Sequence, residues 1–338
     1  MGKTRNAYLI DFIYNQEIEG EGFRNGLKGG DPSKEATAYA LEILDYYDRS
    51  PHRNTDLKSY LESELETMFD NDEIVLYDLY YLLKSLDLLD SPPEARLKER
   101  IHNFINGTEQ IGGGFSFSNT SSLASMSSTY FIVQVFTLIQ EPIPNRTVHK
   151  DWILSCNNSD GGYGANSSLS STLLTTYYAV YLLDALNSVN DLANINQTST
   201  YLNSFYVKNP SDINNFGGGL PDPIADYALI SSTYHYVSAI SIINKEMLNK
   251  EQTAKWVLSR QYFQDGGFAD ITEGTSQRAS SVITSYYAFE TLNISGSLSK
   301  LSADVFMVEF DYWILIIIFA SIGLIAGIWV IVWRRRRI

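Results

Sequence analysis

The sequence predicts an all-α protein of six helical hairpins, followed by one membrane-spanning helix. Two observations predict the hairpins: a glycine-rich phrase recurs at intervals of about 50 residues, and a tyrosine-containing phrase follows it. A repeat of that length without strand-like alternation of apolar and polar residues indicates two helices per unit. A third observation, a long uncharged apolar segment near the C-terminus, predicts the membrane helix.

The glycine-rich phrase is found five times, each time before a predicted helix. Its copies are Gly20–Phe23, Gly112–Phe115, Gly161–Gly164, Gly217–Leu220 and Asp265–Phe268. The first two copies lie about two periods apart, so one unit between them has lost its glycines. Glycine pairs end a helix and permit positive φ, and the residue that follows is expected to fill the gap between two helices. We interpret these turn residues as architecture; they include Gly113, Phe115, Gly162, Tyr163, Gly218, Gly267 and Phe268.

The tyrosine-containing phrase restores the missing unit, because it is found six times. Its copies surround Tyr39, Tyr80, Tyr130, Tyr177, Tyr234 and Tyr286. Serine and threonine precede the tyrosines and suit the N-cap of a helix. Each unit is therefore predicted to be one helix, a turn, and a second helix that begins near its tyrosine.

These phrases resemble the repeats of protein prenyltransferase β-subunits and of squalene (terpene) cyclases. The resemblance covers residues 7–292, and its most specific parts are "DGGYG…TTYYAVYLL" and "DGGF…SYYAFETL"; the copy at 57–89 is weak. It implies an α6/α6 toroid, in which six inner helices surround a central cavity. We accordingly assign residues 1–293 to the toroid.

The zinc site that the resemblance implies for the transferases is not matched by this sequence. In that family an Asp and a Cys flank the turn glycine, and a His begins an inner helix. Here glycine follows Asp160 and Asp265, Cys156 lies before its turn, and His235 is a residue or two beyond the expected position. Lysine and arginine are also too scattered to neutralise a diphosphate. We expect no metal and no other cofactor.

A second kind of chemistry, protonation of an alkene as in class II terpene cyclases, has one candidate segment. "FDNDE" approximates the Asp-x-Asp-Asp motif of that class, with Asp72 and Glu73 as the alternative catalytic residues. The favoured interpretation is a capping box, in which Asp70 is the N-cap of the next helix and Glu73 is its third residue.

The apolar segment at residues 312–333 is predicted to cross a membrane. Its 21 positions from Trp313 to Trp333 contain no charge and no proline, and tyrosine and tryptophan flank them. The linker 294–311 precedes this span, and the basic tail 334–338 follows it. By the positive-inside tendency, the tail is cytoplasmic and the toroid extracytoplasmic, although the N-terminus has no apolar stretch that suits a signal peptide.

Two further features concern partners. The formal net charge of −14 makes nucleic acid an improbable partner. Glycosylation is expected at the seven sequons, which begin at Asn106, Asn119, Asn145, Asn157, Asn166, Asn196 and Asn293.

From these observations we expect a membrane-anchored binding or scaffold module without catalysis of its own. The loops at 112–128, 158–172 and 266–281 are rich in glycine and hydroxyl residues, and we expect them to share one rim with the inner-helix tyrosines. Such a rim would suit a neutral ligand, a glycan or a peptide. The alternative is an isoprenoid enzyme of the prenyltransferase or terpene cyclase type. The candidate ligand-binding residues are Tyr130, Tyr177, Tyr178, Tyr234, His235, Tyr286 and Tyr287.

Overall fold

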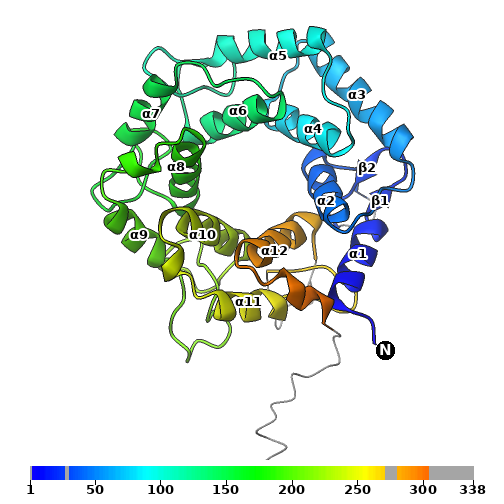
Figure 1. The fold of residues 1–338 in the computed structure, drawn as a ribbon, viewed down its shortest axis with the longest axis vertical. Coiled ribbons are helices and arrows are strands. Elements are labelled where there is room, and N and C mark those ends of the chain that lie inside the picture. The colour runs from blue at the N-terminus through cyan, green and yellow to red at the C-terminus, as the bar shows by residue number, and fades with distance from the viewer. Residues whose placement is uncertain (1, 27–29, 271–279, 304–338) are drawn as a thin grey trace, which may run out of the picture.

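The computed structural model describes residues 2–26, 30–270 and 280–303, and its helices form two concentric rings (Figure 1). The inner ring consists of α2 (Lys34–Tyr46), α4 (Leu76–Leu88), α6 (Met126–Leu138), α8 (Leu173–Ala185), α10 (Ile230–Ile243) and α12 (Val282–Ile294). The outer ring consists of α1 (Arg5–Asn15), α3 (Asn54–Asp70), α5 (Ala95–Thr108), α7 (Arg146–Ser155), α9 (Ile195–Asn203) and α11 (Lys250–Ser259). The short elements are β1 (Glu17–Ile18), β2 (Gly22–Phe23), η1 (Val189–Asp191), η2 (Lys245–Met247) and η3 (Leu298–Ser302). Outer and inner helices alternate along the chain, which confirms the six predicted hairpins.

The ring closes between the first hairpin and the last. Each inner helix packs against the next one along the chain, and α12 packs against α2. On the outer side, the Arg5 guanidinium of α1 donates to the Leu258 carbonyl oxygen of α11 at 3.1 Å. Segments from opposite ends of the toroid are thus neighbours, and the predicted α6/α6 toroid is confirmed.

The glycine turns join each hairpin to the next outer helix, and the last turn shows how close this contact is. Gly266 has φ +93°, and a Cβ atom there would lie 2.1 Å from the Tyr8 carbonyl oxygen of α1. A Cβ atom on Gly267 would lie 2.8 Å from the ring of Phe12. Side chains at these positions would push α1 away, so glycine here serves the closure of the ring.

Three other turns repeat this contact with an aromatic ring of the following outer helix. Glycines 114, 162 and 218 lie against Trp152, Tyr201 and Trp256, respectively. The aromatic residues that follow the turns, Phe115, Tyr163 and Phe268, are completely buried. The interpretation of the turn residues as architecture agrees with this packing.

Hydroxyl side chains near the start of the inner helices tie each turn to its own hairpin. In five hairpins a backbone N–H of the turn donates to a Thr or Ser hydroxyl of the inner helix. The pairs are Phe23 to Thr37 (2.9 Å), Phe115 to Thr129 (3.0 Å), Tyr163 to Thr176 (2.9 Å), Gly219 to Thr233 (2.8 Å) and Phe268 to Ser285 (2.9 Å). The predicted N-capping by these hydroxyl-rich segments is confirmed in four inner helices, where the N-caps are Ser33, Ser125, Thr172 and Ser281.

The second hairpin is the unit that lost its glycine turn, and its structure corrects one interpretation. The predicted capping box is wrong, because Asp70 is the last residue of α3 and α4 begins only at Leu76. Asp72 has φ +56°, and the Glu73 N–H donates to the Met68 carbonyl oxygen. This pattern is the Schellman motif that ends a helix.

The C-terminal part of the described chain packs on the toroid. Within the predicted linker 294–311, η3 contacts α1 and α12, and Leu298 and Leu301 are buried. The predicted span at 312–333 and the basic tail 334–338 lie outside the described residues. No helix within 2–26, 30–270 and 280–303 is long and apolar enough to cross a membrane.

Candidate functional site

A cavity of about 330 Å3 lies at the centre of the toroid, and the inner helices line it. Tyrosines dominate its wall, because consecutive inner helices present equivalent positions to the centre of the ring. The wall consists of Tyr39, Glu42, Tyr80, Tyr81, Lys84, Asp87, Leu88, Tyr130, Phe131, Gln134, Leu138, Tyr177, Tyr178, Tyr181, Tyr234, His235, Tyr286 and Tyr287. Its volume is that of a small-molecule site.

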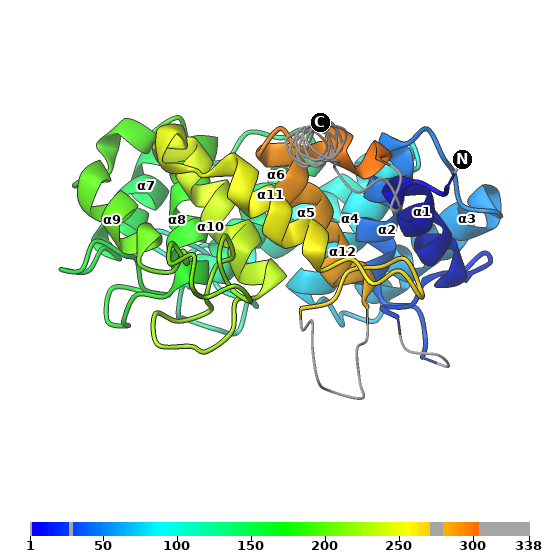
Figure 2. The same cartoon turned by 90° about the horizontal axis from the view of Figure 1, so that it is seen from below.

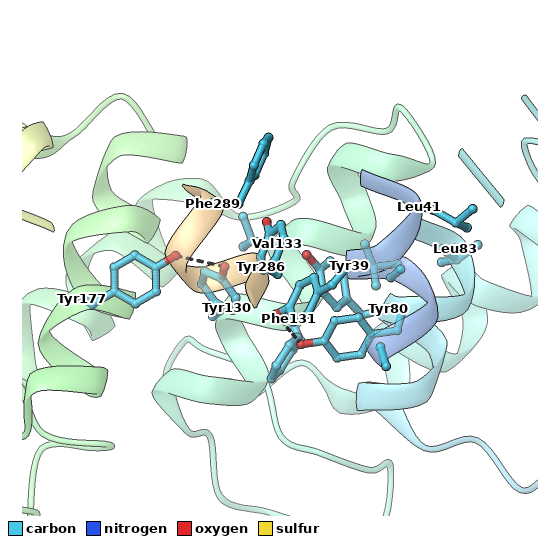
Figure 3. Packing of buried hydrophobic residues seen from close by; sticks show 14 of the residues in the cluster. Tyr39, Leu41, Tyr80, Leu83, Tyr130, Phe131, Val133, Tyr177, Tyr286 and Phe289 are labelled. Atoms are coloured by element: carbon cyan, nitrogen blue, oxygen red, sulfur yellow. Dashed lines mark hydrogen bonds between the residues drawn. The ribbon is translucent and has the colours of Figure 1, made fainter. Parts of the chain in front are cut away.

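The phenol groups of the wall are joined into two chains of hydrogen bonds. One chain links Tyr130, Tyr177 and Tyr234, with oxygen–oxygen distances of 3.3 and 3.2 Å; Figure 3 shows its first bond. The other links Tyr39 to Tyr81 at 2.9 Å and to Tyr287 at 3.5 Å. These bonds pair the phenol groups with one another, which fixes the positions of the rings.

The rings themselves are stacked across neighbouring helices. Tyr39 lies on Tyr286 with a centroid distance of 3.8 Å, and Tyr130 lies on Tyr178 at 4.2 Å. Burial raises the pKa of Tyr177 and of Tyr286 well above the ordinary value, so these phenols are neutral at physiological pH. The wall is therefore aromatic and uncharged over most of its area.

His235 belongs to this aromatic wall. Its ring stacks on Tyr177 with a centroid distance of 5.2 Å. Burial lowers the pKa of His235 to about 3, because the charged imidazolium would be desolvated. The neutral ring contributes area to the wall without adding charge.

Charge on the wall is contributed by α2 and α4, which hold Glu42, Lys84 and Asp87. The Lys84 ammonium forms an ion pair with a Glu42 carboxylate oxygen at 2.5 Å and donates a hydrogen bond to the Tyr286 hydroxyl at 3.4 Å. Glu290 lies beside them on α12, and burial together with the negative charge of Glu42 raises its pKa to about 7. We call Glu42, Lys84 and Glu290 the charged cluster.

A further carboxylate, Glu35, meets the tyrosines near the start of α2. It accepts hydrogen bonds from the Tyr77 hydroxyl and, at 3.1 Å, from the Tyr81 hydroxyl. Burial raises the pKa of Glu35. Through Tyr81 this carboxyl group joins the hydrogen-bonded chain of Tyr39, so one tyrosine chain ends on a carboxyl group.

The structure brings together all seven residues that the sequence singled out for ligand binding, since each of them lines the cavity. Their role in binding stays a prediction. The sequence analysis missed Tyr39, Tyr81, Glu42, Lys84 and Gln134 as residues of the same wall. One signal could have found three of them: a polar residue stands three or four positions after a tyrosine on otherwise apolar inner helices.

The glycine-rich loops do not take part in this cavity. The described parts of these loops project from one face of the toroid (Figure 2). None of the described residues in the loops 112–128, 158–172 and 266–281 lines the cavity. The expected rim of loops and tyrosines is therefore corrected to a wall built from inner helices alone.

The residues present do not fit the zinc ion of the transferases. Asp160 and Asp265 each accept a hydrogen bond from the N–H of the second turn glycine, so both serve their own turns. Cys156 is buried, its thiol donates to the Trp152 carbonyl oxygen, and burial raises its pKa to about 11. Within the parts of the chain that the structure describes, no three His, Cys, Asp or Glu side chains could share a metal ion.

The alternative catalytic residues are also outside the site. Asp72 and Glu73 are exposed at the end of α3, in the outer ring. Asp70 next to them forms an ion pair with Arg100 at 2.8 Å. "FDNDE" therefore ends a helix and does not face the cavity.

Comparison with known proteins agrees with this architecture. The family model of the prenyltransferase alpha-alpha toroid domain matches residues 55–270 and 140–305. The protein belongs to this family. Among relatives, a probable geranylgeranyl transferase type-2 subunit beta of Caenorhabditis elegans is 32% identical over 111 residues, which are 32% of this chain and 33% of that protein. A protein farnesyltransferase subunit beta of Pyricularia oryzae is 23% identical over 219 residues, 57% of this chain and 40% of that protein.

Several solved structures share the fold at low sequence identity. Candida albicans protein geranylgeranyltransferase-I, complexed with GGPP, superposes with a TM-score of 0.56 at 16% identity, over 68% of this chain and 70% of that one. Type II terpene cyclase MstE from Scytonema superposes with a TM-score of 0.54 at 12% identity, over 88% of this chain and 98% of that one. A protein from Actinoplanes superposes with a TM-score of 0.58 at 13% identity, over 86% of this chain and 98% of that one. These likenesses show the fold.

Proposed function

We propose that this toroid binds an isoprenoid chain that carries no diphosphate, and that the central cavity is the binding site. One observation carries the proposal: the cavity wall is made of neutral, stacked aromatic rings with a single small charged cluster. Aromatic faces pack well against the methyl groups and double bonds of an isoprenoid. The wall thus offers aromatic rings with uncharged hydroxyl groups, and one charged end.

The comparisons support the choice of an isoprenoid over other apolar ligands. The Candida structure is a complex with GGPP, and the Scytonema cyclase has been solved with geranylgeranyl dihydroxybenzoate as its substrate. Both proteins place a geranylgeranyl compound on the fold found here. This likeness favours the isoprenoid alternative over a scaffold that presents its loops to a glycan or a peptide.

The charges of the wall argue against a diphosphate as the polar end of the ligand. The described wall has one cationic side chain, Lys84, and Glu42 already pairs with it. Asp87 and Glu42 make the net formal charge of the wall negative. A diphosphate bound there would meet repulsion without the cluster of lysine and arginine that its charge requires.

Anchorage to a membrane completes the proposal. We infer that the apolar segment 312–333 holds the toroid at a bilayer, where isoprenoid alcohols and aldehydes dissolve. Support comes from the composition of that segment and its flanking aromatic residues.

Acid catalysis on the bound chain is the second candidate function, and Glu290 favours it. A carboxyl group with a pKa of about 7 is protonated in a large fraction of molecules at neutral pH, beside an aromatic wall. Aromatic faces also stabilise cations. Incubation with farnesol, followed by extraction and mass spectrometry, separates binding from conversion; conversion that the Glu290→Gln variant loses would show an enzyme.

The binding test uses the full chain in lipid nanodiscs and a fluorescent farnesol analogue. We expect farnesol to displace the analogue and farnesyl diphosphate to do so about tenfold less well, which corresponds to about 1.4 kcal/mol. Gln134→Trp fills the cavity and should abolish binding, whereas Thr137→Trp, on the exposed side of the same helix, should not. Equal binding by both variants, or stronger competition by the diphosphate, would refute the proposal.

A further inference from the structure

Lys84 has an unusual position for a lysine. Its side chain is only 15% exposed, and its ammonium lies in the wall of the cavity, 5.3 Å from the ring centroid of Tyr39 and 5.1 Å from that of Tyr286. Glu42 is its carboxylate partner at 2.5 Å. Lys84 is the one primary amine of the described wall.

Stability does not explain this ion pair. Two charges removed from water cost desolvation energy, and an apolar pair of similar volume is often equally stable or more stable. Three of the other hairpins hold neutral side chains at the equivalent position, namely Gln134, Tyr181 and Ser238. A role of the Glu42–Lys84 ion pair in contacting a ligand therefore explains its position better.

A lysine amine that faces an isoprenoid-sized aromatic cavity is suited to one reaction with a ligand, the formation of an imine with an aldehyde. We propose that Lys84 captures an isoprenoid aldehyde as a protonated imine in this cavity. The inference rests on the proposed function, because it names the polar group of the isoprenoid that the cavity takes.

The step balances with groups that the structure shows. Glu42 accepts a proton from the Lys84 ammonium, and the free amine attacks the aldehyde carbon, forming the C–N bond of a carbinolamine. Glu42 returns the proton to the carbinolamine oxygen, which leaves as water when its C–O bond breaks. The aldehyde and the ammonium thus give a protonated imine and water, with one positive charge on each side and no change of oxidation state.

The surroundings of Lys84 suit the product as well as the free lysine. The protonated imine keeps the positive charge at the same nitrogen, so Glu42 remains its counter-ion. The rings of Tyr39 and Tyr286 continue to face a cation. Capture therefore keeps the ion pair with Glu42, and the isoprenoid chain gains contacts with the aromatic wall. The single N–H of the imine gives up the hydrogen bond to the Tyr286 hydroxyl.

The test is reductive trapping of the imine in the full chain. Purified protein in nanodiscs is incubated at neutral pH with farnesal and cyanoborohydride, which reduces a protonated imine to a stable amine, and peptides are mapped by mass spectrometry. We expect the adduct on Lys84 at least about tenfold more often than on any other lysine. Hexanal, which lacks the isoprenoid chain, should show no such preference. Equal labelling of many lysines by farnesal would overturn the proposal.

Variants separate the imine from simple binding. Lys84→Met should lose the adduct, whereas Lys98→Met, at another part-buried lysine whose ammonium donates to the Ile139 carbonyl oxygen, should keep it. Glu42→Gln removes the counter-ion and should lower the trapped yield about tenfold. If Lys84→Met fails to fold, the double variant Lys84→Met/Glu42→Gln leaves no unpaired charge and takes its place.

The two proposals fail in different ways. If farnesol displaces the fluorescent analogue but farnesal forms no adduct on Lys84, the imine is refuted and isoprenoid binding remains. Absence of farnesol binding would refute the proposed function, and a Lys84 adduct that forms equally with hexanal would then reflect only a reactive amine.

Discussion

The glycine turns and the cavity wall are built from the same six repeats, but their residues vary to different degrees. At the turns, five hairpins use the same hydrogen bond from a turn N–H to a Thr or Ser hydroxyl. On the inner helices, the residue five positions after the hydroxyl position varies between hairpins, and only the first and the last hairpin share a residue type, glutamate. In chain order it is Glu42, Lys84, Gln134, Tyr181, Ser238 and Glu290.

This difference shows that the fold requires the hydroxyl at the turn but permits different residues at the second position. A turn N–H that is buried needs an acceptor in every hairpin, so the hydroxyl recurs. The second hairpin agrees with this explanation. It has no glycine turn, and the buried Leu79 stands where the other hairpins have the hydroxyl. Nothing in the packing of the rings requires a particular polar side chain on the wall, and the diversity there fits the recognition of an asymmetric ligand.

The largest expected effect on stability is at a glycine turn, where the fold requires a fixed backbone geometry. Gly266→Ala places a Cβ atom 2.1 Å from the Tyr8 carbonyl oxygen at φ +93°. We expect the free energy of unfolding to fall by about 3 kcal/mol, from strain and displacement of α1. Chemical denaturation measures this change in the free energy of unfolding. Gly112→Ala, in a turn position with no atom within 4 Å, should change stability by less than about 0.5 kcal/mol; a similar loss in both variants would contradict the account.

The second prediction concerns the charged cluster, which we expect to lower the free energy of unfolding. The pKa of Glu290 is raised to about 7 in the folded state, above its value of about 4 in an unfolded chain. The folded protein therefore binds more protons between these values, and stability falls as the pH rises from about 4 to about 7. Glu290→Gln should remove that slope and leave the protein about 2 kcal/mol more stable than the wild type at pH 8.

Thermal unfolding followed over this pH range measures the effect. Glu42→Gln removes the neighbouring negative charge and should shift the midpoint of the slope to lower pH, because repulsion from Glu42 contributes to the raised pKa of Glu290. A Glu290→Gln variant that is less stable than the wild type at pH 8 would mean that this carboxylate supports the fold.

The smallest expected effect sharpens the comparison at the hydroxyl position. Thr176→Val keeps the shape of the side chain but removes the acceptor for the Tyr163 N–H at 2.9 Å. An unsatisfied buried N–H costs about 1 to 2 kcal/mol of unfolding free energy. Thr200→Val on the exposed surface of α9 should cost less than about 0.5 kcal/mol in the same denaturation experiment. Equal costs would remove the reason for the recurring hydroxyl.

The sequence predicts the fold well because the fold is repetitive. Glycines and tyrosines at constant spacing identify the hairpins, and counting six of them predicts a closed ring, which the contact of α12 with α2 confirms. Sequence reasoning was wrong at "FDNDE". A helix end and a helix start share the same residue types there, and only the hydrogen bond from Glu73 to Met68 distinguishes them.

The site was harder to predict, for a physical reason. The tyrosines could be found because they recur, whereas Glu42, Lys84 and Glu290 come from three different hairpins and meet only when the ring closes. A charged residue on an apolar inner helix was their one local signal. The hydroxyl partner of each turn could also be mistaken for an N-cap, since the capping residue stands only four positions before it.

The most direct measurement of the central claim is the position of a bound isoprenoid. A farnesol analogue with a diazirine group would be irradiated with the full chain in nanodiscs, and its attachment sites would be mapped by mass spectrometry, with and without excess farnesol. The account predicts attachment to wall residues of the inner helices, such as Tyr178 and Gln134, that excess farnesol prevents. Attachment confined to the glycine-rich loops, or unaffected by farnesol, would contradict it.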